Sequence, residues 1–205
     1  MQTVLLSSLY LAPIQYYSKL FRAEKAIIET DDNYQKQSYR NRCVIAAANG
    51  AMHLSIPVEK PEYKCKMKDI RIAEHGNWQH LHWNAIISAY NSSPFFDYYK
   101  DDFAHFYENK IAFLFDLNEQ LRSLICNLLD IETPTIHTTD FIKITSPDIA
   151  DLREAIHPKK DWQKIDHHFE AKSYYQVFAD KNGFVANASI IDLLFNMGNE
   201  SRLYL

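Results

Sequence analysis

The sequence predicts a mixed α/β fold, with α+β as the alternative, in which helices pack on a strand-rich N-terminal third and a helical remainder follows. Apolar, β-permissive runs are concentrated before residue 74, whereas helical spacing of apolar residues dominates from residue 78 onward. Strands and helices therefore do not alternate regularly, which argues against a series of βαβ units. The chain has 205 residues, a usual size for one domain, so we expect a single domain over residues 1–205.

The N-terminal third is expected to contain one short helix and four strands, with a possible fifth. Pro13 stands where helices often begin, and the helix should run to about Ala23. Asn49-Gly50 separates two strand-like runs, which is the strongest short-range signal for a β-hairpin. The expected strands are Thr3–Tyr10, Ala26–Glu29, the hairpin pair Tyr39–Ala48 and Ala51–Val58, and a further candidate at Met67–Ala73.

The rest of the chain is expected to be mainly helical. One helix spans Trp78–Asn91, where Trp78, Leu81 and His82 share a face that should be buried. The other expected elements are helices over Phe95–Phe115, from Asp116 to about Leu129, Asp148–Ile156 and Ser189–Met197, with a short strand at Phe141–Ile144.

The last helix should dock on the main body of the protein. Asn187 is a good N-cap, and Gly198 stands at the position that usually closes a helix. Apolar residues recur on one face, while Asp192 and Asn196 lie four residues apart on the other. Those two polar side chains face either water or a pocket, and the spacing alone leaves both interpretations open.

Composition excludes several classes of protein. The four glycines are isolated, so neither of the two common glycine-rich phosphate loops can be written. A net charge of −4 argues against a nucleic-acid partner, because such domains are usually strongly basic. No apolar run approaches the ~20 residues of a membrane span.

The three cysteines favour a reducing compartment. Cys43, Cys65 and Cys126 form no C-x-x-C motif and leave an odd count, so we expect free thiols and a cytoplasmic protein. None of them has an adjacent base, and there is no G-x-S-x-G motif, so no nucleophile is recognised.

A polar stretch from Asp31 to Arg42 is the clearest candidate for chemistry. If Tyr39–Ile45 is extended, Tyr39 and Asn41 face one way while Arg40 and Arg42 face the other. Two acids followed by several cations suit a zwitterionic or phosphorylated ligand, because arginine binds carboxylate and phosphate in a bidentate manner. The alternative is an exposed connection with local ion pairs, each contributing about 0–1 kcal/mol.

Nine histidines raise the question of a metal site, but their spacing argues against one. His80 and His82 are two apart, so on a helix they point to different faces, and no H-E-x-x-H motif occurs. His82 shares its face with Trp78 and Ile86 and should be buried. It is then either a structural group or a general base.

Several ordered motifs together resemble the WbqC-like family of bacterial proteins. They are Leu9–Tyr17, Tyr34–Arg42, Leu54–Val58, Trp78–His82, Tyr90–Phe96 and Asn187–Gly198. The family typically opens with His-Gln-Pro-x-Tyr-x-Pro, whereas this chain has Ser8-Leu9-Tyr10-Leu11-Ala12-Pro13. The opening histidine is missing, so no role for it is carried over. Asn41 and Arg42 match the family's Asn-Arg pair, which a tryptophan often precedes.

The resemblance implies a role in surface-polysaccharide synthesis, because family members occur among genes for O-antigen and related sugars. It suggests a transferase that moves an acyl or aminoacyl group onto a nucleotide-linked amino sugar, a small-molecule substrate. On this hypothesis Asp32 and His82 are catalytic, and the substrate-binding residues are Lys36, Tyr39, Asn41, Arg42, Tyr90, Asp192 and Asn196. The sequence identifies no cofactor and no oligomeric state. The competing interpretation is a non-catalytic binding or scaffold protein, favoured by the lack of a nucleophile, metal set or phosphate loop.

Overall fold

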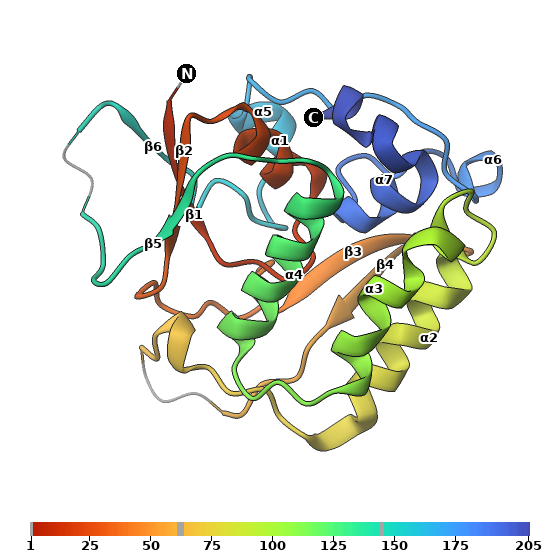
Figure 1. Cartoon of the computed structure of the whole chain (residues 1–205), viewed down its shortest axis with the longest axis horizontal. Helices are drawn as coiled ribbons and strands as arrows, with labels where there is room; N and C mark the ends of the chain where they lie inside the picture. The colour runs from red at the N-terminus through yellow and green to blue at the C-terminus, as the bar shows by residue number, and fades with distance from the viewer. Residues whose placement is uncertain (1, 61–63, 144–145) are drawn as a thin grey trace.

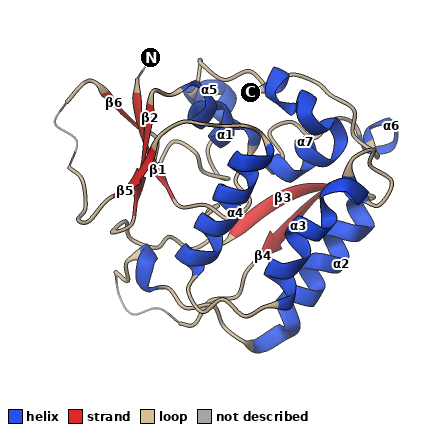
Figure 2. Ribbon diagram, viewed as in Figure 1, coloured by secondary structure: helices blue, strands red, loops and turns tan. Residues whose placement is uncertain are grey.

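A four-stranded parallel sheet forms one side of the molecule (Figures 1 and 2). The structure, a computed structural model, describes residues 2–60, 64–143 and 146–205. The strand order is β5-β2-β1-β6, with β1 (Thr3–Ser7), β2 (Lys25–Glu29), β5 (Thr135–His137) and β6 (Ile149–Asp151). Helix α1 (Ile14–Arg22) connects β1 to β2, so a βαβ unit opens the chain. The mixed α/β class is confirmed.

Two of the four parallel strands come from the second half of the chain, which the sequence did not predict. The helix expected over Asp148–Ile156 is wrong, because β6 pairs with Thr3–Leu5 of β1 instead. Its three residues gain ladder hydrogen bonds from a strand nearly 150 positions away, and such pairing overrides local propensity. Phe141–Lys143 form no strand, and Ile144 lies outside the described residues.

The predicted hairpin is confirmed as β3 (Arg42–Ala47) and β4 (Gly50–Ser55), but its two-residue turn is Ala48-Asn49, one residue earlier than expected. Gly50 has φ +98°, a conformation that favours glycine. The first strand begins at Arg42 rather than Tyr39, because residues 36–41 form turns. The strand expected at Met67–Ala73 is also wrong: Met67–Asp69 form a 3₁₀ turn, η1, and residues 71 and 72 each make only an isolated bridge.

Three long helices follow the hairpin in the chain. They are α2 (Trp78–Tyr90), α3 (Phe96–Glu108) and α4 (Leu114–Leu128), and α2 packs beside α3 (Figure 1). The helix expected to reach Phe115 ends at Glu108, and Leu81, expected to be buried, is 60% exposed. Shorter elements are η2 (His75–Asn77), α5 (Trp162–Ile165), α6 (Ala179–Asn182) and η3 (Gly198–Tyr204). Among the described residues, no helix is both long and apolar enough to cross a lipid bilayer.

The C-terminal helix α7 (Ile190–Met197) is buried along its length, as the apolar spacing predicted. Gly198 closes it with φ +53°, but the N-cap is Ser189 rather than Asn187. The Asn187 side chain instead accepts a hydrogen bond from the Gln15 backbone N–H at 2.9 Å, so it caps α1. Buried apolar side chains from both sheets and from α1 to α4 and α7 form one continuous core.

Candidate functional site

The carboxyl ends of the parallel strands meet at the lower edge of the sheet in Figure 1. From β1 the chain crosses to β2 on one side, whereas β6 lies on the other side of β1. In open α/β sheets, ligands bind outside the carboxyl ends of the strands at such a switch point. This edge is our candidate functional site. We call its polar side chains the carboxyl-edge cluster: Ser7, Glu29, Asp31, Asp32, Arg40, Arg153 and Glu154.

Arg40 lies at the centre of the cluster. Its side chain is 1% exposed, and its Nη2 donates to Ser7 Oγ at 3.1 Å, to Glu154 Oε1 at 3.1 Å and to Asp32 Oδ2. Ser7 Oγ also donates to Asp32 Oδ2 at 2.8 Å. A buried guanidinium needs such partners, because an unpaired buried charge costs several kcal/mol. These bonds fix both Arg40 and Asp32 in place.

Only one oxygen of the Asp32 carboxylate is used in this way. Asp32 Oδ1 makes no hydrogen bond to any of the described residues, although the residue is 7% exposed. Four neighbouring polar atoms are buried without a partner in the same part of the structure: Ser8 Oγ, Arg40 Nε, Asn41 Oδ1 and Asn118 Oδ1. Asn118 belongs here because its Nδ2 donates to the Arg40 carbonyl at 2.9 Å. Buried polar atoms are usually satisfied, so this concentration of unsatisfied atoms marks the edge as unusual and as a candidate for function.

Glu29 and Arg153 form the second half of the cluster, and their role is to hold strands together. Arg153 Nη1 donates to Glu29 Oε2 at 3.1 Å, and Arg153 Nη2 donates to Asp151 Oδ2 at 2.6 Å. Glu29 is fully buried and also accepts from Thr138 Oγ1 at 2.6 Å. Because every oxygen of Glu29 is engaged, this pair links β2, β6 and the segment after β5 and leaves no free group for chemistry.

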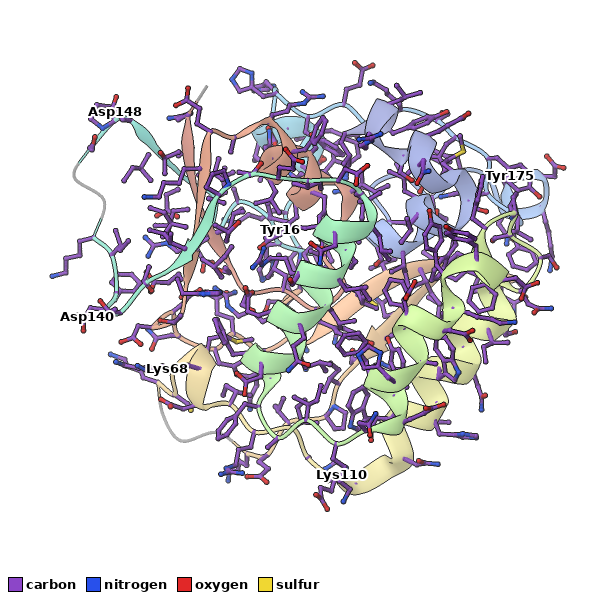
Figure 3. All side chains as sticks on the ribbon, in the orientation of Figure 1. Tyr16, Lys68, Lys110, Asp140, Asp148 and Tyr175 are labelled. Atoms are coloured by element: carbon purple, nitrogen blue, oxygen red, sulfur yellow. The ribbon has the colours of Figure 1, made fainter. Side chains whose placement is uncertain are left out.

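Asp31 faces two lysines from the η1 segment. Its side chain is 3% exposed, and it pairs with Lys66 and, at 2.6 Å, with Lys68, which Figure 3 labels. Hydrogen bonds from Lys66 and then Lys68 hold the pKa of this carboxyl below its usual range. The lysines are themselves 48% and 41% exposed, so their ammonium groups lie at the rim of the cluster.

More cations surround Arg40. The half-buried Tyr34 has a pKa raised by burial, an effect that the nearby charges of Arg42 and Arg40 oppose. Burial also lowers the pKa of His157. The nearby Glu154 opposes this effect, and the nearby cations Arg40, Lys160 and Lys159 add to it. The rim of the cluster therefore carries several cations, next to acids such as the half-exposed Glu154 and, near Lys68, Asp69 and Asp140. Individual arginine and lysine side chains at this rim are available to contact anionic groups.

His82 lies in a separate buried network. Its Nδ1 is 3.0 Å from the Tyr10 hydroxyl, which is 2.9 Å from the Tyr107 hydroxyl. Burial lowers the pKa of His82 to about 4, although a hydrogen bond with the Ser55 carbonyl opposes the effect. The imidazole is therefore neutral at physiological pH and already has polar partners, an arrangement typical of a structural histidine.

Asp192 is the centre of another buried network. Its carboxylate accepts hydrogen bonds from Tyr90 at 2.9 Å, Tyr174 at 2.5 Å and Gln176 at 2.7 Å. Burial raises the pKa of Asp192 to about 6, against the effect of these three donors. Asn196, 3% exposed, donates to the Asp192 carbonyl at 2.7 Å. Neither polar side chain of α7 faces water.

The structure thus brings some of the predicted site residues together and separates others. Asp32, Asn41 and Arg42 lie at or beside the carboxyl edge. Asn41 Nδ2 donates to the Ile56 carbonyl at 2.8 Å, and Arg42 Nε donates to Ser55 Oγ at 3.0 Å. Lys36 is exposed in the turn before Arg40, and Tyr39 is half-buried. His82, Tyr90, Asp192 and Asn196 belong to the two other networks. No group of His, Cys, Asp and Glu side chains among the described residues is placed to hold a metal ion.

Comparison with known proteins supports the resemblance to the WbqC-like family over most of the chain, although the motif Asn187–Gly198 lies outside the matched residues. The model of the WbqC-like protein family matches residues 8–159, more than half of the chain. The chain belongs to the WbqC-like family. It is 26% identical over 217 residues to "Uncharacterized protein Rv1507c" of Mycobacterium tuberculosis, covering 93% of this chain and 91% of that protein. No solved structure matches it.

The WbqC-like match begins where β1 ends and includes most of the carboxyl-edge cluster. Sequence reasoning missed Glu29, Arg40, Arg153 and Glu154 as members of this cluster. For Arg40 it expected an extended strand, whereas a turn directs the side chain inward to Asp32. One signal was available: two consecutive acids lie two residues after the end of a buried strand, and buried acids need a cation nearby.

Proposed function

We propose that this WbqC-like protein is a cytoplasmic transferase that acts on a nucleotide-linked amino sugar in surface-polysaccharide synthesis. On this proposal the sugar nucleotide binds at the carboxyl edge, and an acyl or aminoacyl group is transferred to the sugar amine. The observation that carries the proposal is Asp32: Oδ2 is held by Ser7 and Arg40, while Oδ1 has no partner among the described residues. A carboxylate anchored through one oxygen is well suited to act as a base through the other.

In the proposed reaction the sugar amine attacks the acyl carbonyl of an activated donor. Asp32 Oδ1 accepts the amine proton as the new C–N bond forms. The bond between the acyl carbon and the donor's leaving group then breaks, and its electron pair goes to that group. Arg40 and Ser7 hold the carboxylate in position throughout. We assign this proton transfer to Asp32 rather than His82, because His82 belongs to a separate network in which its Nδ1 already contacts Tyr10.

Arginine and lysine side chains at the rim supply the proposed binding of the diphosphate. Arg42 and Lys36 neutralise phosphate charge, as the sequence pattern suggested. The lysine pair Lys66 and Lys68 is half-exposed at the same edge. On this proposal Asn41 turns its carbonyl oxygen, which is buried and unpartnered in this structure, towards a hydroxyl or amide of the sugar. Arginine and lysine are the usual phosphate partners in proteins.

Isothermal titration against a panel of nucleotide sugars, followed by an acyl-transfer assay on those that bind, tests the proposal. We expect Arg42→Ala to weaken binding about tenfold, the effect of removing one charged hydrogen bond. Asp32→Asn should keep binding and reduce turnover at least a hundredfold, the usual contribution of a positioned base. Asp97→Asn and Arg202→Ala, at exposed positions outside the cluster, are the matched controls.

Three results would contradict the proposal. The first is a panel in which no nucleotide sugar binds, and the second is binding that Arg42→Ala leaves unchanged. The third is full transfer activity in Asp32→Asn. Absence of all nucleotide-sugar binding would favour the alternative of a non-catalytic scaffold protein. That alternative would then need a partner for exposed aromatic side chains such as Tyr98, which is 78% exposed.

A further inference from the structure

A cleft of about 340 Å³ lies away from the carboxyl edge, and no residue of the carboxyl-edge cluster lines it. Three segments form its walls: residue 59 after β4, residues 71–79 leading into α2, and residues 110–112 between α3 and α4. Backbone hydrogen bonds join them, from Glu59 N–H to the Arg71 carbonyl at 3.0 Å and from Ile72 N–H to the Ala112 carbonyl at 2.9 Å. The cleft is therefore built on connected backbone, and its volume suits a small molecule.

Two acids and two cations line the cleft, and among the described residues one acid and one cation of this set form an ion pair with each other. Lys110, labelled in Figure 3, pairs with Glu74 at 3.1 Å. The Arg71 guanidinium stacks over the Phe113 ring at 4.7 Å. Within the described part of the chain, neither Arg71 nor Glu59 has an ion pair of its own. Both side chains are exposed, so the cleft presents to solvent one positive group, stacked on Phe113, and one negative group.

Trp78 provides an independent indication of a ligand. This residue lines the cleft and is only 8% exposed. Its indole N–H nevertheless makes no hydrogen bond to any described residue, and it is not among the polar atoms sealed in the interior. A tryptophan buried to this degree usually satisfies its N–H. Trp78 also opens α2, whose N-terminal end favours a negative group.

We propose that this cleft binds a small zwitterion that carries a carboxylate and an ammonium group. The carboxylate is bound by Arg71 and the Trp78 indole N–H, and the ammonium group by Glu59. The apolar side chains of the walls, among them Ile72 and Ile111, contact the rest of the molecule. The lining acids repel a polyanion such as a diphosphate. This site is separate from the carboxyl edge, and the inference does not rest on the proposed transferase function.

Three probes of matched shape test the inference by titration calorimetry on the full chain. L-Leucine carries both charged groups, 4-methylpentanoate lacks the amine, and 3-methylbutylamine lacks the carboxylate. We expect leucine to bind, and each truncated probe to bind at least about tenfold more weakly, because each loses one charged hydrogen-bonded contact. Binding of both truncated probes as tightly as leucine would overturn the inference, as would no leucine binding up to roughly 10 mM.

Two substitutions then assign the groups. Arg71→Gln should weaken leucine and 4-methylpentanoate about tenfold and leave the amine unaffected, whereas Glu59→Gln should weaken leucine and the amine only. Arg202→Gln and Glu132→Gln, outside the cleft, are the controls, and thermal melting checks that every variant is folded. Arg71→Lys keeps the charge and should retain part of the affinity. Equal effects of Arg71→Gln and Glu59→Gln on all probes would refute the assignment. Titration of a nucleotide sugar with the same variants keeps the two sites distinguishable.

Discussion

The buried carboxyl group of Asp192 should make the stability of the protein fall as pH rises. Asp192 is fully buried, and burial raises its pKa from 3.8 to about 6 even though three side chains donate hydrogen bonds to it. The native state therefore holds the proton more tightly than the unfolded chain. As pH rises from about 4 to about 6, the unfolded state loses its proton first, and the free energy of unfolding decreases.

The size of this effect follows from the pKa difference. Because one pKa unit corresponds to about 1.4 kcal/mol, a pKa raised from 3.8 to about 6 lowers the free energy of unfolding by about 3 kcal/mol above pH 6. Below pH 4 this loss is absent, since Asp192 is protonated in both states. A total stability of about 5–15 kcal/mol is usual for a domain, so the loss is measurable.

Urea denaturation of the wild-type protein and of Asp192→Asn, at intervals from pH 4 to pH 7.5, isolates this group. Asparagine cannot ionise and also removes an acceptor for Tyr174 or Gln176, so the variant differs from wild type at every pH. All other acids cancel in the difference between the two proteins. We expect the stability of the variant relative to wild type to rise by about 3 kcal/mol between pH 4 and pH 7. A difference that stays constant over this range would refute the reasoning.

Two further predictions concern positions where the structure leaves little freedom. Gly198→Ala should lower the free energy of unfolding by about 1–3 kcal/mol more than Gly183→Ala, measured by thermal or urea unfolding. Both glycines have a positive φ, but only at Gly198 would a Cβ lie 2.8 Å from the Phe95 ring. Equal losses in the two variants would contradict this. Arg40→Met should cost about 3–5 kcal/mol by leaving Asp32 buried without its cation, and the double variant Arg40→Met/Asp32→Asn should recover much of the loss in urea unfolding. A double variant as unstable as the single one would show that packing, rather than charge, is the cause.

Elements with strong local signals were predictable from the sequence. The hairpin around Asn49-Gly50 and the helix from Trp78 follow from turn chemistry and apolar spacing, and both are present. Gly198 closes α7 because a positive φ at that position favours glycine. In each case the information lies within a dozen neighbouring residues.

Features that depend on distant partners were not predictable. The local sequence around residues 149–151 predicts a helix. These residues instead form a strand of the parallel sheet, because they pair with the edge of β1 that β2 leaves open. Asparagine at position 187 predicts an N-cap for α7. Its side chain instead accepts a hydrogen bond from the Gln15 backbone N–H and so caps α1. Likewise, Arg40 turns inward because Asp32 and Glu154 meet it there, and the contact with Glu154 spans 114 positions.

The buried network around Asp192 connects α7 to the candidate site through the hairpin. Tyr90 donates to Asp192 and accepts a hydrogen bond from the Ala46 N–H at 3.3 Å, and the Ser189 N–H donates to the Val44 carbonyl at 2.7 Å. These bonds connect β3 to Tyr90 and to the residue before α7. β3 directly follows the turn that contains Arg40. The direction in which the chain enters β3 therefore depends on α7, although α7 lies outside the residues matched by the family model. On this reasoning Asp192 positions the carboxyl edge from a distance, and its substitution should affect binding there only to the extent that it loosens β3.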